Sequence, residues 1–597
     1  MTTTELADVA WNLDDLVGAD GPAGVDRLLG EAAELAAAFN ASYAGKVAEL
    51  DGPGLAGAIR ELAAIADAIG RAANYASLRF STDTADPAVG ALMAKVQERG
   101  TAIETQLLFF DLEWAEVEDG KADALLEADG LEQARHHLRA IRRYRPYLLT
   151  EKEETILAEK SQSGDSAWSR LFSELTSAIE VELPEGTVAL DVALSKLSDP
   201  DREIRRTTQE QVTEALKPGL RTRGYIFNTL LLDKSVDDRL RGYPSWLSSR
   251  NLSNEATDES VQALVAAVKG SYELPQRWYR LKAKLLGLEK LADYDRAASV
   301  AEVDVEIGWD EARDIVLGSF DAFSPVLGNT ARRFFDEQWI DAPVRPSKRG
   351  GAFCAYTVPS VHPYVLLNYT SKRRDVLTLA HELGHGLHAA LAQDRGPFEQ
   401  HTPLTLAETA SVFGETLVFK QLLDAATDPA SRLSLLAENI EGSIATVFRQ
   451  TAMNQFEAAV HTARREEGEL SVERIGDVWA LTQTELLGDA VEVTENYRSW
   501  WSYVPHFIGT PGYVYAYAYG QLLALSVYGQ YLERGEEFVP AYVELLSAGG
   551  SKSPEELAQI AGLDLADPGF WQSGIDLVRG QLEAAEAVAE EVMAARD

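Results

Sequence analysis

The residues best suited to chemistry lie in the segment DVLTLAHELGHGLHAAL, residues 375–391. Its apolar residues recur every three or four positions, which predicts a helix with a broad buried face. His381 and His385 share one face of that helix, so both imidazoles can bind one metal ion. Glu382, one step round the helix, can reach a water on that ion as a general base. The H-E-x-x-H pattern predicts a catalytic zinc site, whereas two ordinary buried histidines beside a Glu would leave a costly unpaired carboxylate.

A catalytic zinc ion takes three protein ligands and keeps one position open. In the metzincin pattern the third ligand is a His ten residues after the first, but here that residue is Leu391. The segment HTPLTLAETASVFGETLVF predicts a second helix with Glu408 and Glu415 two turns apart on one face. We predict Glu408 as the third ligand because it lies nearer the helix start; the alternatives are a surface carboxylate or an ion-pair partner. We hypothesise that the Glu415 carboxylate accepts the N–H of a ligand His.

A third segment, SWWSYVPHFIGTPGYVYAYAYGQ, joins His506 to a cluster of tyrosines. In a helix Tyr513 and Tyr517 share one face while Tyr515 and Tyr519 share another, whereas in a strand all four point the same way. The sequence leaves both conformations open. Phenol and imidazole donors would suit an oxyanion opposite a metal, and the alternative is an aromatic core with one hydrogen-bonded His.

Composition limits the class of protein. The chain has 597 residues, 46% of them hydrophobic, and a formal net charge of −39, so we expect a large globular protein of two or more lobes. Because nucleic-acid affinity depends on Lys and Arg, we expect no nucleic-acid partner. The single Cys354 excludes an intramolecular disulfide, and the N-terminus lacks a signal-peptide pattern. We therefore expect a cytoplasmic protein.

One uncharged run, residues 507–532, is long enough to cross a bilayer. It contains Pro511, several glycines, two glutamines and the tyrosine cluster, a composition better suited to a polar-lined cleft. We therefore expect no membrane partner.

The elements that position these residues follow from the hydrophobic pattern. About 180 residues read as successive helices, and then alternating residues around Pro184 predict a β-hairpin. We place a boundary there, between an N-terminal helical domain (1–180) and a catalytic metallopeptidase domain (181–597). A second β segment, residues 350–369, ends in YVLLNY. Because proline cannot donate to a sheet, we predict that the strand carrying Pro363 is an edge strand able to accept an extended peptide along residues 363–369.

Four blocks then carry a family resemblance: LNYTSKRRDVLTLAHELGHGLH, LAETASVFGE, VFRQTAMNQFE and WWSYVPHFIGTPGYVYAYAYG. Together, in this order, they resemble the oligoendopeptidase F branch of the thimet-oligopeptidase family of zinc metallopeptidases. The resemblance implies a mainly α fold, a two-lobed helical ellipsoid with a deep central channel and a small β-sheet near one zinc ion. By position the resemblance implies that the zinc ligands are His381, His385 and Glu408 and that the catalytic base is Glu382. It implies substrate contacts at His506, Tyr513 and Tyr517.

The last block departs from the family pattern. One more residue than usual separates His506 from the tyrosines, and Gly520 stands where thimet oligopeptidase has a further catalytic Tyr. The Tyr that stabilises the oxyanion is therefore left open, with Tyr513 and Tyr519 as candidates. The sequence predicts a zinc-dependent endopeptidase that hydrolyses short oligopeptides, with a helical zinc carboxypeptidase as the alternative. It leaves open whether the protein is a monomer or a homodimer.

Overall fold

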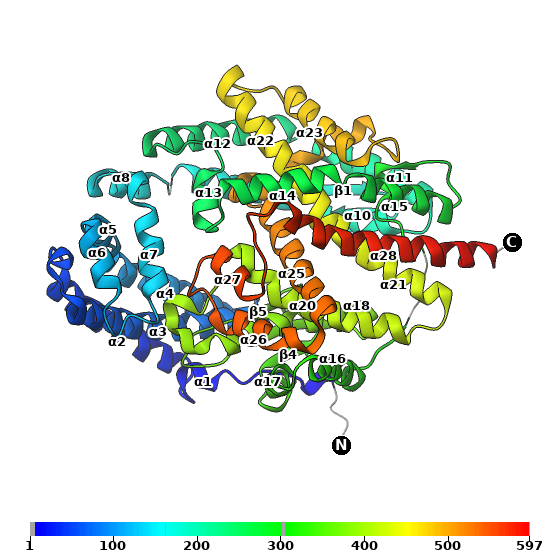
Figure 1. Cartoon of the computed structure of the whole chain (residues 1–597). Helices are drawn as coiled ribbons and strands as arrows, with labels where there is room; N and C mark the ends of the chain where they lie inside the picture. The colour runs from blue at the N-terminus through cyan, green and yellow to red at the C-terminus, as the bar shows by residue number, and fades with distance from the viewer. Residues whose placement is uncertain (1–5, 162, 301–304, 596–597) are drawn as a thin grey trace. The chain divides into compact units, whose positions relative to one another are not determined.

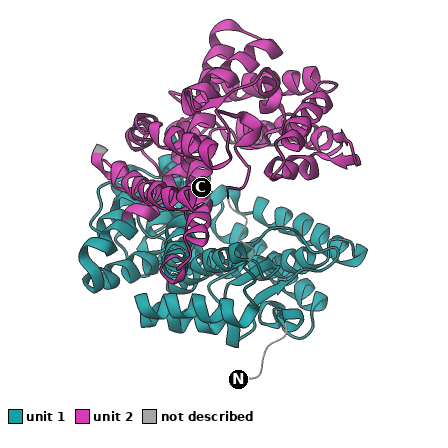
Figure 2. Cartoon of the chain, turned by 90° about the vertical axis from the view of Figure 1, so that its right-hand side faces the viewer, with its two compact units in different colours: residues 1–145, 304–422, 527–564 teal, residues 146–303, 423–526, 565–597 magenta. Residues whose placement is uncertain are grey.

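The computed structural model describes residues 6–161, 163–300 and 305–595, and helices dominate these ranges (Figure 1). The mainly α class predicted from the sequence is confirmed. The chain divides into two compact units, each assembled from three separate segments (Figure 2). Unit 1 contains residues 1–145, 304–422 and 527–564, and unit 2 contains residues 146–303, 423–526 and 565–597. The division into sequence domains 1–180 and 181–597 is a different partition and stays a prediction.

Unit 1 is helical with one small sheet. Its helices are α1 (Asp14–Val17), α2 (Pro22–Tyr43), α3 (Gly52–Thr82), α4 (Pro87–Thr105), α5 (Leu108–Glu116), α6 (Asp119–Leu126), α7 (Arg135–Arg143), α16 (Trp309–Phe323), α17 (Pro325–Asp336), α18 (Arg373–Leu391), α19 (Gly396–Glu399), most of α20 (Leu404–Ala425), the last part of α25 (Tyr515–Arg534), α26 (Val539–Ala548) and α27 (Pro554–Ile560). Helix starts use the expected signals: the Asp51 carboxylate accepts the Gly54 N–H at 2.8 Å ahead of α3.

Unit 2 is also helical and carries two short β pairs. Its helices are α8 (Glu151–Ser161), α9 (Asp165–Ser177), α10 (Leu190–Ser195), α11 (Arg202–Leu216), α12 (Leu220–Arg241), α13 (Ser248–Ser253), α14 (Asp258–Gly270), α15 (Glu273–Leu285), α21 (Pro429–Ser443), α22 (Gln450–Glu467), α23 (Val472–Leu487), α24 (His506–Gly509), the first part of α25 (Tyr515–Arg534) and α28 (Pro568–Ala594). A short parallel pair joins β3 (Leu291–Ala292) to β7 (Val491–Glu492).

The predicted hairpin is confirmed. Strand β1 (Glu180–Leu183) pairs antiparallel with β2 (Gly186–Ala189), and Leu183 stands opposite Gly186 across the two-residue turn. Buried side chains alternate along β1, as a strand with one covered face requires.

The sheet of unit 1 corrects one prediction. It contains β4 (Ile340–Pro343), β5 (Phe353–Ala355) and β6 (Tyr364–Tyr369) in the order β4-β6-β5. Pro363 precedes β6 and takes no ladder position, so it does not force an edge. The prediction that this strand is an edge open to peptide is wrong, because β4 pairs with β6 on one side and β5 on the other. The described edge strand near the motif helix is β5.

No helix in the described part of the chain has the length and apolarity needed to span a bilayer. The uncharged run of residues 507–532 instead contains most of α24, a short connection and most of α25.

Candidate metal centre

Helix α18 carries the H-E-x-x-H motif through its middle. At its start the Asp375 carboxylate accepts the backbone N–H of the N-cap residue Lys372 at 3.1 Å and that of Thr370, in the preceding loop, at 2.7 Å. The apolar face predicted from the sequence is buried, and Glu382 is buried with it at 7% exposure. The motif therefore lies on a rigid, well-packed helix rather than on a loop.

Helix α20 approaches α18 at a point without side chains (both helices are labelled in Figure 1). A Cβ on Gly384 would lie 2.4 Å from the carbonyl oxygen of Ala410 and 2.6 Å from the Cα of Ser411. A Cβ on Gly414 would likewise lie 3.1 Å from the carbonyl oxygen of Ala380. Glycines on both helices thus permit the close crossing that brings Glu408 to the histidines.

His381, His385 and Glu408 each direct one ligand atom to the same point. These atoms lie within 4.8 Å of one another, and no other group of this kind is found among the described residues. Glu408 Oε2 lies 3.3 Å from His381 Nε2 and 3.7 Å from His385 Nε2. With metal–ligand bonds of about 2.0–2.2 Å, tetrahedral ligand atoms stand roughly 3.3–3.6 Å apart. The donor set and its spacing fit a zinc ion, with both histidines presenting Nε2.

Two further side chains orient these ligand atoms. Glu415 Oε2 lies 3.0 Å from His381 Nδ1, the ring nitrogen that faces away from the cluster. A carboxylate there fixes the tautomer that leaves Nε2 free to bind a metal. The Ser411 hydroxyl donates to Glu408 Oε2 at 2.7 Å. Ser411 was missed in the sequence, although its position one turn after Glu408 is the signal that could have found it.

Burial and charge set the protonation of the cluster in the protein alone. Burial lowers the pKa of His385 to about 4, which keeps the ring neutral, as a metal ligand must be. Burial opposes ionisation of Glu408, but the hydrogen bond and charge of His381 prevail and lower its pKa to about 2. Burial raises the pKa of Glu382 to about 7, and a backbone hydrogen bond from Cys354 partly offsets this. Glu382 thus has a higher pKa than Glu408 and lies outside the ligand group.

The Cys354 thiol does not join this chemistry. Cys354 lies on β5, and burial together with the charge of Glu382 raises its pKa well above the usual range, which disfavours a reactive thiolate. His388, one turn beyond His385, is 2% exposed and stands outside the ligand group. Burial lowers the His388 pKa to about 3, so its ring is a neutral part of the packing.

The tyrosine block belongs to unit 2, and the structure settles its local conformation. Tyr515 begins α25, so the helical alternative holds for Tyr515, Tyr517 and Tyr519, whereas Tyr513 precedes the helix. Tyr515 and Tyr519 are buried. Tyr517 Oη lies 3.2 Å from His506 Nε2, and the Tyr513 ring stacks parallel to the His506 ring at 5.9 Å. The structure therefore brings His506, Tyr513 and Tyr517 together as one cluster.

Tyr519 is not part of that cluster. Its side chain is fully buried and its ring contacts Trp571 edge-on at 4.6 Å. Of the two candidates left open for an oxyanion donor, only Tyr513 stands beside His506.

Comparison with known proteins gives the family. The model for peptidase family M3 matches residues 321–577 and that for the oligopeptidase F N-terminal region matches residues 113–180, together more than half of the chain. Oligopeptidase PepF of Bacillus subtilis is 27% identical over 515 residues, covering 84% of this chain and 76% of PepF.

Solved structures share the fold. A chain from Chlamydophila abortus aligns with a TM-score of 0.85 at 22% identity, covering 98% of this chain and 99% of that one. The oligoendopeptidase-F of Enterococcus faecium aligns with a TM-score of 0.72 at 22% identity, covering 95% and 99%. The motif blocks, the family models and these relatives agree: the chain belongs to peptidase family M3, in its oligoendopeptidase F branch, and is a metalloendopeptidase.

Proposed function

We propose that this protein is a zinc-dependent oligoendopeptidase that hydrolyses short peptides, with Glu382 as the general base. The observation that carries the proposal is the convergence of His381, His385 and Glu408 beside Glu382. Zinc, when bound there, would polarise the scissile carbonyl and lower the pKa of water toward about 7.

The side chains around the ligands have distinct tasks in this proposal. His381, His385 and Glu408 hold the ion, while Glu415 and Ser411 keep the first and last of them in position. The Glu382 carboxylate accepts the proton of the attacking water and delivers it to the leaving amine. Its burial supports this role, because a carboxylate with a pKa of about 7 exchanges a proton readily near neutral pH.

Substrate binding is proposed along β5 rather than β6. Strand β5 is an edge of the sheet, its residues are half-buried, and its Cys354 N–H already reaches Glu382. An extended peptide could add to this edge by main-chain hydrogen bonds. From the family resemblance we assign substrate contacts to His506, Tyr513 and Tyr517, and their mutual packing supports a shared role.

A quenched peptide blocked at both ends tests the function. The zinc-loaded protein should cleave it internally, a chelator should stop cleavage, and added zinc should restore it. A carboxypeptidase could not cut such a peptide, so products formed only from peptides with a free C-terminus would replace this function with the alternative. Location in the cytoplasm remains a prediction.

A further inference from the structure

Unit 2 contains a cavity of about 460 Å³ that includes His506 in its wall. The rest of the lining comes from residues 194–197, α15, residues 293–297, residues 441–453, α23 and the segment 497–505. Aromatic side chains supply much of the lining, and two arginines, Arg296 and Arg449, supply its positive charge. Both arginines lie far from the H-E-x-x-H motif in sequence and took no part in the site described above.

Neither guanidinium group forms a close ion pair with a carboxylate among the described residues, although the Asp293 charge acts on Arg296. Arg449 is exposed and makes neither an ion pair nor a side-chain hydrogen bond there. Arg296 donates only to neutral acceptors, from Nε to the Asp293 carbonyl oxygen at 3.0 Å and from Nη2 to Tyr497 Oη at 2.7 Å. The chain has 94 acidic and 55 basic residues, whereas the lining of this cavity has two arginines and two acidic residues, so the overall excess of acid is absent here.

The acidic residues of the same wall are already engaged. Glu441 pairs with Lys282 at 2.5 Å and accepts the Trp278 indole N–H at 3.2 Å. The Asp293 carboxylate accepts the backbone N–H of Thr494 at 2.6 Å and its hydroxyl at 2.9 Å. Glu441 is therefore engaged by Lys282, and the Asp293 charge acts on Arg296, which leaves Arg449 as the guanidinium that neither carboxylate neutralises.

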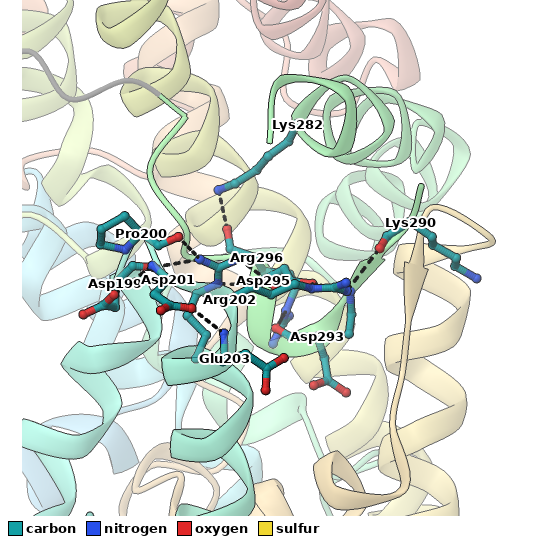
Figure 3. A network of polar contacts seen from close by, with 12 residues as sticks. Asp199, Pro200, Asp201, Arg202, Glu203, Lys282, Lys290, Asp293, Asp295 and Arg296 are labelled. Carbon is teal, nitrogen blue, oxygen red and sulfur yellow. Dashed lines mark hydrogen bonds and ion pairs between the residues drawn. The ribbon is translucent and has the colours of Figure 1, made fainter. Parts of the chain in front are cut away.

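A buried polar network fixes Arg296 in place. Figure 3 shows the Lys282 ammonium reaching the carbonyl oxygen of Arg296, at 2.6 Å. One residue earlier, the fully buried Asp295 carboxylate binds both Arg202 and Arg205 at 2.9 Å. Because the backbone on either side is held by these contacts, the Arg296 side chain is presented to the cavity without a large ordering cost.

Two polar groups of the wall also lack partners in the described structure. The Tyr503 hydroxyl makes no hydrogen bond there, and Gln450 Oε1 is buried without one. A phenol can donate to an anionic oxygen, and an amide oxygen can accept the N–H that accompanies any peptide carboxylate. These groups complement the arginines with the donor and acceptor that a peptide end or an acidic residue needs.

We propose that this cavity is a subsite for a carboxylate of the peptide substrate, bound by Arg449 and Arg296 with Tyr503 as a further donor. The proposal rests on the proposed function, since His506 links the cavity wall to the assigned substrate contacts. Arginine suits the task because its planar fork binds a carboxylate through two parallel hydrogen bonds. The carboxylate comes either from an acidic side chain or from the C-terminus, and the two sources are separable by experiment.

The test compares matched peptides. Each quenched peptide is made with Glu or Gln at a chosen position, and separately with a free acid or an amide at its C-terminus. At fixed ionic strength, the wild-type kcat/KM should be about tenfold higher for the carboxylate member of one pair than for its neutral member. The difference should lie in KM, because the charge-assisted hydrogen bonds already form when the substrate binds. The pair that shows this preference identifies the source.

In Arg449→Gln, the ratio of kcat/KM for the carboxylate peptide to kcat/KM for its neutral partner should fall close to one. Arg296→Lys should reduce the same ratio. Arg474→Gln is the matched control, because Arg474 is an exposed arginine of unit 2 that pairs with Glu467 outside the cavity. It should keep the wild-type ratio. An unchanged ratio in Arg449→Gln, or no preference in wild type for either pair, would overturn the subsite.

A binding measurement separates this proposal from the proposed function. Fluorescence anisotropy with Glu382→Gln needs no hydrolysis and should show the same carboxylate preference, lost on adding Arg449→Gln. If wild type cleaves peptides but both assays ignore Arg449, the subsite is wrong and the function stands. If no peptide is cleaved while carboxylate peptides bind through Arg449, the function is wrong and the subsite stands.

Discussion

At the residue scale, the candidate metal centre depends on atoms that the H-E-x-x-H pattern does not contain. Glu415 holds the far nitrogen of His381, and Ser411 donates to the same Glu408 oxygen that faces both histidines. These contacts select the tautomer of one ligand and the orientation of another.

The clearest consequence concerns Glu415. Glu415→Ala removes the acceptor of the His381 Nδ1–H, so zinc affinity should fall about 10–100-fold. Competition with a chelator measures the affinity, and activity at saturating zinc should recover most of the wild-type value. Glu438→Ala, which changes a carboxylate outside the ligand cluster, is the control. An unchanged affinity in Glu415→Ala would remove Glu415 from the site.

A second consequence concerns Glu457 on α22. Its side chain is 1% exposed, accepts the Gly512 N–H at 2.9 Å between His506 and Tyr513, and burial raises its pKa to about 8. Because the folded pKa exceeds the ordinary value, the folded state binds the extra proton between about pH 4.5 and 8. The contribution of this group to the free energy of unfolding is fully present below about pH 4.5. It is lost progressively as the pH rises to about 8, by at most about 5 kcal/mol in total.

Glu457→Gln keeps the acceptor and removes the titration. In urea unfolding, the free energy of unfolding of the variant should therefore rise relative to that of wild type between pH 5 and pH 8.5. Glu466→Gln, an exposed position on the same helix, should follow wild type at both values. Parallel pH profiles for wild type and Glu457→Gln would contradict the buried, protonated carboxyl.

At the element scale, the sequence predicted the helices better than their contacts. Spacing alone placed His381 and His385 on one helix face and offered Glu408 from the next helix. It could not show that α18 and α20 meet at Gly384, because that contact joins backbone atoms of two separate segments. It also misread β6, since a proline just before a strand gives the same pattern as one within it.

The helix crossing gives its own prediction. Gly384→Ala places a Cβ 2.4 Å from a backbone oxygen of α20, which cannot move independently of its helix. The variant should lose about 1–3 kcal/mol of unfolding free energy and bind zinc more weakly. Gly318→Ala on α16, where nothing lies within 4 Å, should be neutral or slightly stabilising. If both substitutions behave alike, the two helices are not held by this contact.

At the scale of the whole molecule, charge acts differently over long and short range. We expect the formal charge of −39 to attract cationic peptides through solvent, where salt screens it within about 10 Å at 0.1 M. The cavity wall instead contains Arg296 and Arg449, two cations proposed to bind a carboxylate at short range. Composition predicted the first effect; the second joins residues more than 150 positions apart and required the structure.

Salt distinguishes the long-range effect. For a Lys-rich quenched peptide, KM should rise several-fold between about 20 and 200 mM salt, because attraction by the acidic surface is screened. A neutral peptide of equal length should change little. Equal salt dependence of the two peptides would show that the overall charge does not act on binding.

The most direct test of the account is Glu382→Gln, assayed for both metal and activity. Gln preserves the size of the side chain but cannot take the proton of water, while His381, His385 and Glu408 stay intact. Elemental analysis should find one zinc per chain in wild type and variant, and cleavage of a peptide blocked at both ends should fall about 10²–10⁴-fold. A zinc-loaded Glu382→Gln protein that cleaves the peptide at the wild-type rate would contradict the assignment of the catalytic base.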